Sequence, residues 1–184
     1  MQSFLIPFVT ISLAEIGDKT QLALFCLASR THKRASLLLG ALLAFAITDG
    51  LAILFGEFIA RVIPLVWVKI IAGVIFIGFG LLTPLKSSDE SMKCELKDPF
   101  STAFTMIVVS EMGDKTQIAT ALFAVSYEPF TVFLGVLCAL GLLSVVAIYL
   151  GQSLFAKVEP RLRSYLAGSL FILIGFWQLL EIWR

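Results

Sequence analysis

Hydrophobic positions dominate the chain and fall into six long runs separated by short polar segments. A membrane-spanning helix needs about 20 mostly apolar residues, and each run approaches that length if a few embedded polar residues are tolerated. Five of the six prolines fall at or near the ends of these runs, where a missing N–H costs little. The pattern predicts membrane helices over Phe4–Ala28, Ser36–Phe58, Leu65–Leu85, Phe100–Tyr127, Phe130–Phe155 and Tyr165–Trp183.

The composition supports an all-α membrane protein. Of 184 residues, 59% are hydrophobic and only 15% are charged, and the mean hydropathy is +0.96. These values lie outside the usual range for a soluble domain. The net charge of +1 gives no reason to expect a nucleic-acid partner, and no nucleic-acid-binding motif is present. The expected surroundings are a lipid bilayer.

The predicted loops differ in positive charge, which indicates how the chain is oriented. Lysine and arginine in short loops favour the cytoplasmic side of a membrane. Nine lie in the first, third and fifth loops and three on the other side, so both termini are expected outside the cytoplasm. The nine are Arg30, Lys33, Arg34, Lys86, Lys93, Lys97, Lys157, Arg161 and Arg163, and the three are Arg61, Lys69 and Arg184.

A repeat relates the two halves of the chain. EIGDKTQLA at residues 15–23 and EMGDKTQIA at residues 111–119 match at seven of nine positions with an offset of 96. The similarity continues at an offset of 95, where Gly40 pairs with Gly135. The small paired residues are typical of close helix packing in membranes.

The repeat predicts a division into two three-helix units. Residues 1–85 form the first, residues 86–98 form a cytoplasmic linker, and residues 99–184 form the second. Because three crossings reverse the side from which the chain enters the membrane, the second unit must be inverted relative to the first. Inverted repeats are typical of secondary transporters, whose binding sites lie near the midplane between the repeats.

Six charged side chains occupy the middle of the first and fourth runs. Left to lipid they would cost on the order of 15 to 20 kcal/mol, so they must face one another, water or an ion. Both motifs lie at mid-depth on helices of opposite direction, which lets them meet. Four carboxylates and two ammonium groups sum to a charge of minus two, which either one divalent cation or two protons would neutralise. The six are Glu15, Asp18, Lys19, Glu111, Asp114 and Lys115.

The side chains of the motifs favour a hard cation. Carboxylate and amide oxygens suit Ca²⁺, Mn²⁺ or Mg²⁺, and the motifs contain no thiolate or imidazole that would suit zinc or copper. The candidate metal ligands are Glu15, Asp18, Gln21, Glu111, Asp114 and Gln117. The other motif residues are expected to support the site. The glycines would allow a local helix break and the lysines would act as counter-ions. These supporting residues, with the threonines, are Gly17, Lys19, Thr20, Gly113, Lys115 and Thr116.

Asp49 breaks the symmetry of the repeat. It lies near the middle of the second run, and its counterpart in the second half is Ser144. An ionisable residue inside a membrane indicates function by default. Two roles are open for Asp49: it faces the metal, or it carries a proton.

The doubled E-x-G-D-[KR]-[ST] motif, placed on the first helix of each half, resembles the signature of the Gdt-one family of cation/proton antiporters, which includes bacterial manganese exporters of the MneA type. The resemblance covers the whole chain. It implies exchange of Mn²⁺, or Ca²⁺, for protons, with the paired motifs lining the ion site and no bound cofactor. It also implies export of manganese across the inner membrane.

Three other interpretations are weighed against this one. The six charged residues could form buried ion pairs only, although such pairs contribute little stability. The chain could export amino acids or another small organic solute, since small transporters with inverted repeats exist. It could be an intramembrane aspartyl protease, which pairs two aspartates on facing helices, but a lysine directly after each aspartate would disturb a dyad that shares a proton.

Overall fold

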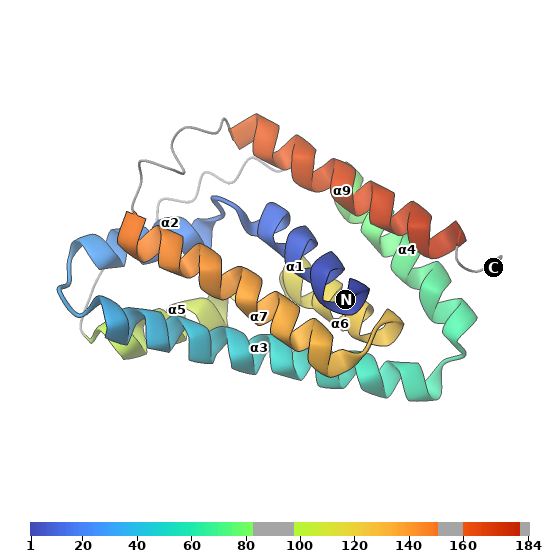
Figure 1. Ribbon diagram of the computed structural model, residues 1–184, viewed down its shortest axis with the longest axis horizontal. Coiled ribbons are helices and arrows are strands. Elements are labelled where there is room, and N and C mark those ends of the chain that lie inside the picture. Colours follow the sequence, from blue (N-terminus) through green and yellow to red (C-terminus); the bar gives the residue numbers. More distant parts are fainter. Residues whose placement is uncertain (83–97, 151–159, 181–184) are drawn as a thin grey trace.

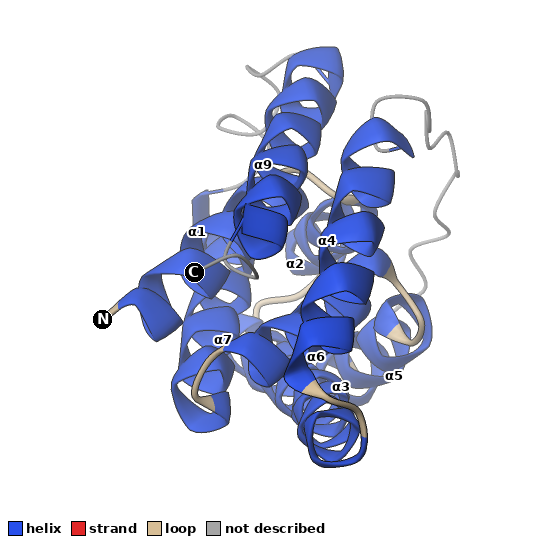
Figure 2. Cartoon of the chain, turned by 90° about the vertical axis from the view of Figure 1, so that its right-hand side faces the viewer, coloured by secondary structure: helices blue, strands red, loops and turns tan. Residues whose placement is uncertain are grey.

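A computed structural model describes residues 1–82, 98–150 and 160–180 (Figure 1). Every regular element in these ranges is a helix (Figure 2), as the sequence predicts. The elements are α1 (Gln2–Glu15), α2 (Lys19–Ser29), α3 (Arg34–Val62), α4 (Leu65–Leu82), α5 (Pro99–Glu111), α6 (Lys115–Ser126), α7 (Pro129–Val145), η2 (Val146–Leu150) and α9 (Pro160–Leu180).

The predicted helix over Phe4–Ala28 is two helices, and so is the one over Phe100–Tyr127. α1 ends at Glu15 and α2 begins at Lys19, while α5 ends at Glu111 and α6 begins at Lys115. Both breaks fall inside the repeated motif. The expectation of a local break at the motif glycines is therefore confirmed in both halves.

α5 and α7 begin with acidic N-caps. The Asp98 side chain accepts from the backbone N of Ser101 at 2.9 Å and from its hydroxyl at 3.0 Å. These bonds hold the pKa of Asp98 below its ordinary value. At α7 the Glu128 side chain accepts from the hydroxyl and the backbone N of Thr131, which lowers the pKa of Glu128. Each cap satisfies an N–H that a helix start leaves without a partner.

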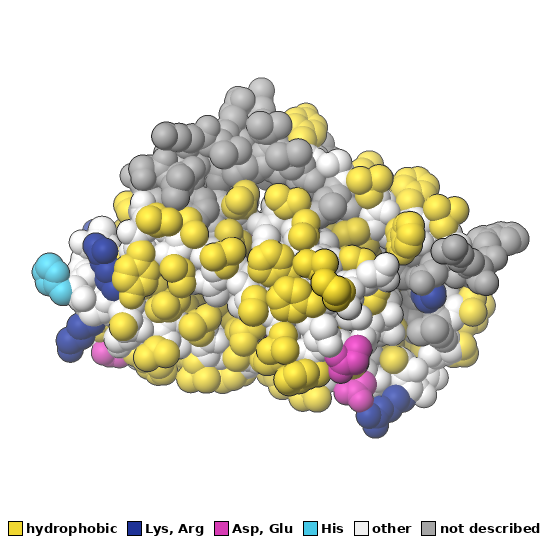
Figure 3. Space-filling view, viewed as in Figure 1, with side chains coloured by type: hydrophobic (Ala, Val, Ile, Leu, Met, Phe, Trp, Pro, Cys, Tyr) yellow, Lys and Arg dark blue, Asp and Glu magenta, His cyan; other side chains and the backbone are white. Residues whose placement is uncertain are grey.

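Apolar side chains cover much of the surface of the described helices. Figure 3 shows hydrophobic side chains spread over one face, with charged side chains gathered towards its two ends. In the described part of the chain, two helices are long and apolar enough to cross a membrane, Arg34–Val62 and Pro129–Leu150. α1 is apolar but short, because the motif interrupts it. Such a surface suits contact with lipid rather than water.

The two halves contact each other in a reciprocal way. α3 packs against α5, and α7 packs against α1. Gly40 of α3 lies against the backbone of Phe100 so closely that a Cβ would clash, and a Cβ on Gly135 of α7 would lie 2.7 Å from the carbonyl oxygen of Phe4. The paired glycines thus make equivalent contacts across the two halves, and the absence of a side chain is what permits them.

α4 and α9 form a close pair beside the remaining helices (Figure 1). A Cβ on Gly175 would lie 2.7 Å from the carbonyl oxygen of Gly73. Between the two helices the rings of Phe76 and Phe171, which are counterparts in the repeat, stack with centroids 5.9 Å apart. Phe76 also meets Phe123 of α6 at 5.2 Å, which joins this pair to the core.

Several sequence predictions concern residues outside the described ranges. The linker at residues 86–98 lies there except for Asp98. So do the predicted helix ends at Leu85, Phe155 and Trp183, and the positions that carry much of the loop charge, Lys86, Lys93, Lys97, Lys157 and Arg184. The orientation therefore stays a prediction.

Candidate cation site

The first motif folds into a type II turn between two helices. Ile16 has φ −59° and ψ 116°, Gly17 has φ 70°, and the backbone N of Asp18 donates to the carbonyl oxygen of Glu15 at 3.0 Å. A type II turn requires a positive φ at its third residue, which glycine adopts without steric cost. The glycine of the motif is therefore needed by the backbone.

The second motif repeats the same turn. Met112 has φ −62° and ψ 114°, Gly113 has φ 79°, and the backbone N of Asp114 donates to the carbonyl oxygen of Glu111 at 3.1 Å. At the variable second position both residues supply the extended backbone that the turn needs, while Ile16 packs against the core and Met112 is exposed. This explains why isoleucine and methionine both serve there.

The glutamines that follow the motifs hold the turns. Gln21 Oε1 accepts from the backbone N of Gly17 at 2.8 Å, and Gln117 Oε1 accepts from that of Gly113 at 2.7 Å. Gln21 Nε2 donates to the carbonyl oxygen of Glu15, whereas Gln117 Nε2 donates to that of Thr48 on α3 at 3.1 Å. The amide oxygens predicted as metal ligands thus already accept a backbone bond, which gives them a structural role in the turn.

Both aspartates occupy N-cap positions without making the usual cap. Asp18 precedes α2 and Asp114 precedes α6, with φ near −70° and ψ near 165°, yet neither side chain bonds to its own helix. An N-cap aspartate normally accepts from the second or third N–H of the helix. Asp18 Oδ2 is buried and has no hydrogen-bond partner in the described part of the chain. The carboxylates are thus left available for another ligand.

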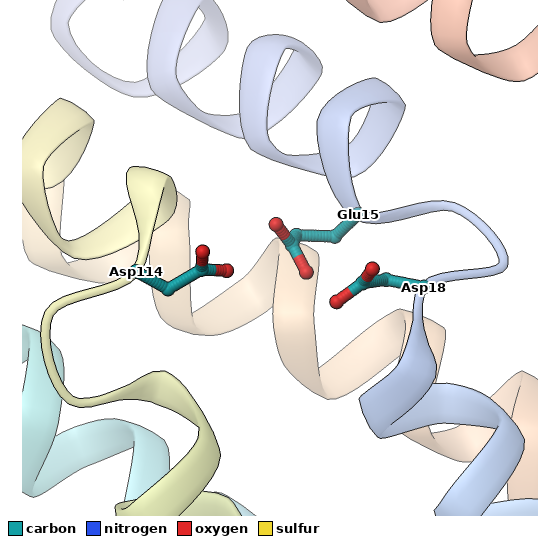
Figure 4. A group of neighbouring side chains, drawn as sticks. All are labelled: Glu15, Asp18 and Asp114. Atoms are coloured by element: carbon teal, nitrogen blue, oxygen red, sulfur yellow. The ribbon is translucent and has the colours of Figure 1, made fainter. Parts of the chain in front are cut away.

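Three carboxylates from the two motifs converge. Glu15, Asp18 and Asp114 each offer an oxygen, and the three oxygens lie within 4.8 Å of one another. Figure 4 shows Glu15 and Asp18 approaching from the first break and Asp114 from the second, with their carboxylates directed towards one another. Two ionised carboxylates at that distance repel by about 3 kcal/mol at an effective dielectric constant of about 20. Three such pairs require a cation or protons to be stable.

Threonine hydroxyls link the motifs across the halves. Thr20 Oγ1 donates to Glu111 Oε1 at 2.7 Å, and Thr116 Oγ1 donates to Glu15 Oε1. Each motif therefore provides the donor for the glutamate of the other. Glu15 is 2% exposed and Glu111 is 5% exposed. The two motifs meet in a buried position, as the sequence predicts.

The lysines of the motifs do not pair closely with these acids. Among the described residues, neither Lys19 nor Lys115 has a nitrogen within 4.0 Å of a carboxylate oxygen, and the ion pair observed is the surface pair Arg61–Glu57 at 2.5 Å. Buried ion pairs alone therefore do not account for the motifs. A counter-ion role at longer range stays a prediction.

Two of the predicted acids lie outside the three-carboxylate cluster. Glu111 is held by Thr20, as described above. Asp49 is 4% exposed and accepts from Thr120 Oγ1 at 3.2 Å. The sequence interpretation missed Thr120, although it lies four residues after Thr116 and so on the same face of a helix. It also missed Ser110, whose Oγ lies 3.5 Å from Thr20 Oγ1.

Comparison with known proteins gives one family. A family model described as "Divalent cation/proton antiporter GDT1" matches residues 3–91 and again residues 99–184. The two matched segments together cover nearly the whole chain, and each corresponds to one half of the repeat. No solved structure matches the chain.

Individual relatives show the same similarity. A Vibrio cholerae serotype O1 protein named "Putative manganese exporter" is 31% identical over 180 residues, which cover 95% of this chain and 89% of the relative. "GDT1-like protein 5" of Arabidopsis thaliana is 29% identical over 220 residues, covering 98% of this chain and 96% of the relative. "GDT1-like protein 2, chloroplastic" of Oryza sativa subsp. japonica is 38% identical over 93 residues, covering 48% of this chain and 27% of the relative.

Proposed function

The chain belongs to the GDT1 family of divalent cation/proton antiporters, and from this premise we propose that it exports Mn²⁺ from the cytoplasm in exchange for protons. It is a membrane transport protein and not an enzyme, which removes the protease interpretation. Ca²⁺ is the second candidate ion, because Ca²⁺ and Mn²⁺ both accept oxygen ligands.

The observation that carries this proposal is the convergence of Glu15, Asp18 and Asp114 at the two helix breaks. Their oxygens form a hard, anionic site on the junction of the two halves. Glu111, Gln21 and Gln117 stay proposed ligands, although Glu111 lies outside the cluster and both amide oxygens already accept a glycine N–H. Broken helices whose ends meet at mid-depth are the usual way in which transporters form an ion site.

Charge balance supports the coupling to protons. The cluster cannot hold its full negative charge alone, as the repulsion above indicates, and a divalent cation or protons can each relieve it. Because cation and protons then compete for the same oxygens, occupancy by one favours release of the other. Lys19 and Lys115 act as counter-ions that stabilise the site between these states.

The arrangement in the membrane follows from the repeat. We infer six spans in two inverted three-helix units, in which α1 with α2, and α5 with α6, each cross the membrane as one broken helix. The reciprocal contacts of Gly40 and Gly135 support this arrangement, since equivalent positions make equivalent contacts. The protein then lies in the cell inner membrane with both termini outside the cytoplasm.

An exporter of amino acids is less consistent with the site. Such a substrate carries its own carboxylate, and the three clustered carboxylates would repel it. The two motif lysines, which we assign as counter-ions of these carboxylates, are then not available to receive that group. The same features favour a small divalent cation.

The test is cation flux into proteoliposomes with Glu15→Gln and Asp114→Asn. We expect Mn²⁺ flux at low Mn²⁺ to fall at least about tenfold in each variant, since a loss of about 1.4 kcal/mol of binding free energy suffices. Glu57→Gln is a matched control, because Glu57 is a half-exposed glutamate paired with Arg61 away from the cluster. It should leave flux unchanged.

Parallel measurements with Mn²⁺, Ca²⁺ and Mg²⁺ would identify the ion, and an imposed pH gradient would test the coupling. Wild-type Mn²⁺ flux should follow that gradient. Undiminished Mn²⁺ flux in both cluster variants would refute the assigned site. Flux that ignores the gradient would refute proton exchange even if the site binds the ion.

A further inference from the structure

A line of polar side chains leaves the cation cluster along one helix. On α6, Thr116 donates to Glu15, Gln117 donates to the backbone of Thr48, and Thr120 donates to Asp49. These donors span about one helical turn. They connect the cluster to a buried carboxylate on α3 that does not belong to it.

The equivalent line in the other half stops one turn earlier. On α2, Thr20 and Gln21 make the equivalent motif contacts, but the counterpart of Thr120 is Leu24, which is fully buried in the apolar core. The counterpart of Asp49 is Ser144, whose hydroxyl donates to the carbonyl oxygen of Leu140 in its own helix at 2.7 Å. The polar extension therefore exists on one side only.

The surroundings of Asp49 do not compensate a negative charge. Thr120 supplies one neutral donor, and within the described part of the chain no cationic nitrogen lies within 4.0 Å of the carboxylate. α7 carries no charged side chain. The titratable and charged side chains on the elements packed against α3 are Glu111 at the end of α5, Asp114 and Lys115 at the start of α6, Lys19 at the start of α2, Cys138 of α7 and Tyr149 of η2.

A carboxylate that is buried without a cation is far more stable with a proton bound. We propose that Asp49 is the proton-carrying side chain of the antiport, set apart from the cation cluster, and that Thr120 is its positioning residue. The proposal deepens the function given above and rests on it. It also decides between the two roles that the sequence leaves open for Asp49.

The position of Asp49 and Thr120 gives the proton route a direction. α6 runs from the motif to Ser126, so Thr120 lies on the side of the cluster towards that end. That end belongs to the face predicted to lie outside the cytoplasm. In the step, the O–H bond of the Asp49 carboxyl breaks as an O–H bond forms on a carboxylate that the cation has left. The Asp49 carboxylate then regains a proton from outer water.

Asp49→Asn separates proton transfer from cation exchange. The asparagine keeps the size of the side chain and an oxygen for the Thr120 hydroxyl, but it cannot carry a proton. In proteoliposomes, exchange of external for internal Mn²⁺ at equal pH should stay close to wild type, because it needs no net proton movement. Proton movement driven by a Mn²⁺ gradient, read with a luminal pH dye, should fall at least about a hundredfold, the lower range for a positioned proton-transfer group.

Thr120 provides a second and independent variant pair. Thr120→Val should slow the proton movement while Mn²⁺ exchange persists, and Thr120→Ser, which restores the hydroxyl, should recover it. Ser144→Ala is the control at the position that mirrors Asp49, and it should leave both measurements unchanged. If Asp49→Asn does not fold, this comparison decides the proposal alone.

Two results would overturn the inference. Proton movement at the wild-type rate in Asp49→Asn would show that another group carries the proton. Loss of Mn²⁺ exchange together with proton movement, in a folded variant, would make Asp49 part of the cation site instead. Failure of the proposed function itself is distinct, because the wild-type protein would then show no Mn²⁺ exchange.

Discussion

Gly113 has a left-handed backbone, so it is informative whether alanine at this position stabilises or destabilises the fold. Its φ is 79°, and a Cβ built on it would have no atom within 4 Å. Alanine at this position would therefore meet no steric obstacle from its surroundings. Its whole effect would come from the backbone conformation, which costs about 1–2 kcal/mol for a residue with a Cβ.

If the motif were part of a continuous helix, the substitution of glycine by alanine would instead stabilise the fold. There Gly→Ala stabilises by about 0.5–1 kcal/mol, because alanine loses less conformational freedom on folding. Gly78 offers this case within the same chain, since it lies inside α4 and a Cβ on it would also have nothing within 4 Å. Gly78→Ala should thus be neutral or stabilising while Gly113→Ala destabilises.

The measurement is equilibrium unfolding in mixed micelles, titrated with a denaturing detergent and followed by circular dichroism. A cost of about 1–2 kcal/mol corresponds to a change of about 5- to 30-fold in the ratio of folded to unfolded protein. Gly113→Asn should cost less than Gly113→Ala, because asparagine adopts the left-handed region more readily. Mn²⁺ flux should fall with alanine as the turn that places Asp114 is distorted.

Gly113→Ala should not be as stable as wild type or more stable. That result would mean that the protein tolerates a helical backbone through the motif. The turn would then not be what positions Asp114, and the geometry of the cluster would lose its explanation.

Two further substitutions test local contacts. Thr116→Val removes the donor to the buried Glu15 and should lower the free energy of unfolding by about 1–3 kcal/mol, whereas Thr116→Ser should restore most of it; equal stability of both variants would contradict the bond between the halves. Because its bonds to Ser101 hold the pKa of Asp98 low, that cap stabilises the fold above the ordinary aspartate pKa of about 3.9 and is lost as the pH falls through the lower folded-state value. Asp98→Asn, which caps without titrating, should flatten the acid limb of melting temperature against pH, and an unchanged acid limb would show that the cap contributes nothing there.

Much of the candidate site could be predicted from local sequence. The doubled motif, its mid-depth position and the glycine in each copy were enough to expect two breaks that meet. The breaks follow from backbone chemistry that only a few residues around Gly17 and Gly113 determine, and such local signals are readable in a sequence.

The contacts between the halves could not be predicted in the same way. The bonds from Thr20 to Glu111 and from Thr116 to Glu15 join residues about ninety or more positions apart, and which hydroxyl meets which carboxylate depends on how the helices pack. The role of Gln21 in the turn was likewise missed, because a glutamine beside acids suggests a ligand before it suggests a brace for a glycine N–H.

For the same reason the sequence does not predict that only three of the four motif acids form the cluster. The repeat treats Glu15 and Glu111 as equals, yet the structure brings Glu15 into the cluster with both aspartates and leaves Glu111 outside it. The halves differ in sequence around these acids: Ser110, Thr120 and Asp49 have Ala14, Leu24 and Ser144 as their counterparts. The repeated motif alone therefore does not predict which of the two glutamates joins the carboxylate cluster.

With the inverted arrangement proposed above, this asymmetry has an energetic meaning. Contacts present in both halves, such as the two threonine–glutamate bonds, exchange roles between the two access states and add no difference in free energy between them. A ligand can shift such an equilibrium only by binding the two states differently. Groups without a counterpart in the repeat can make proton binding differ between the two states, and Asp49 is a buried acid of that kind.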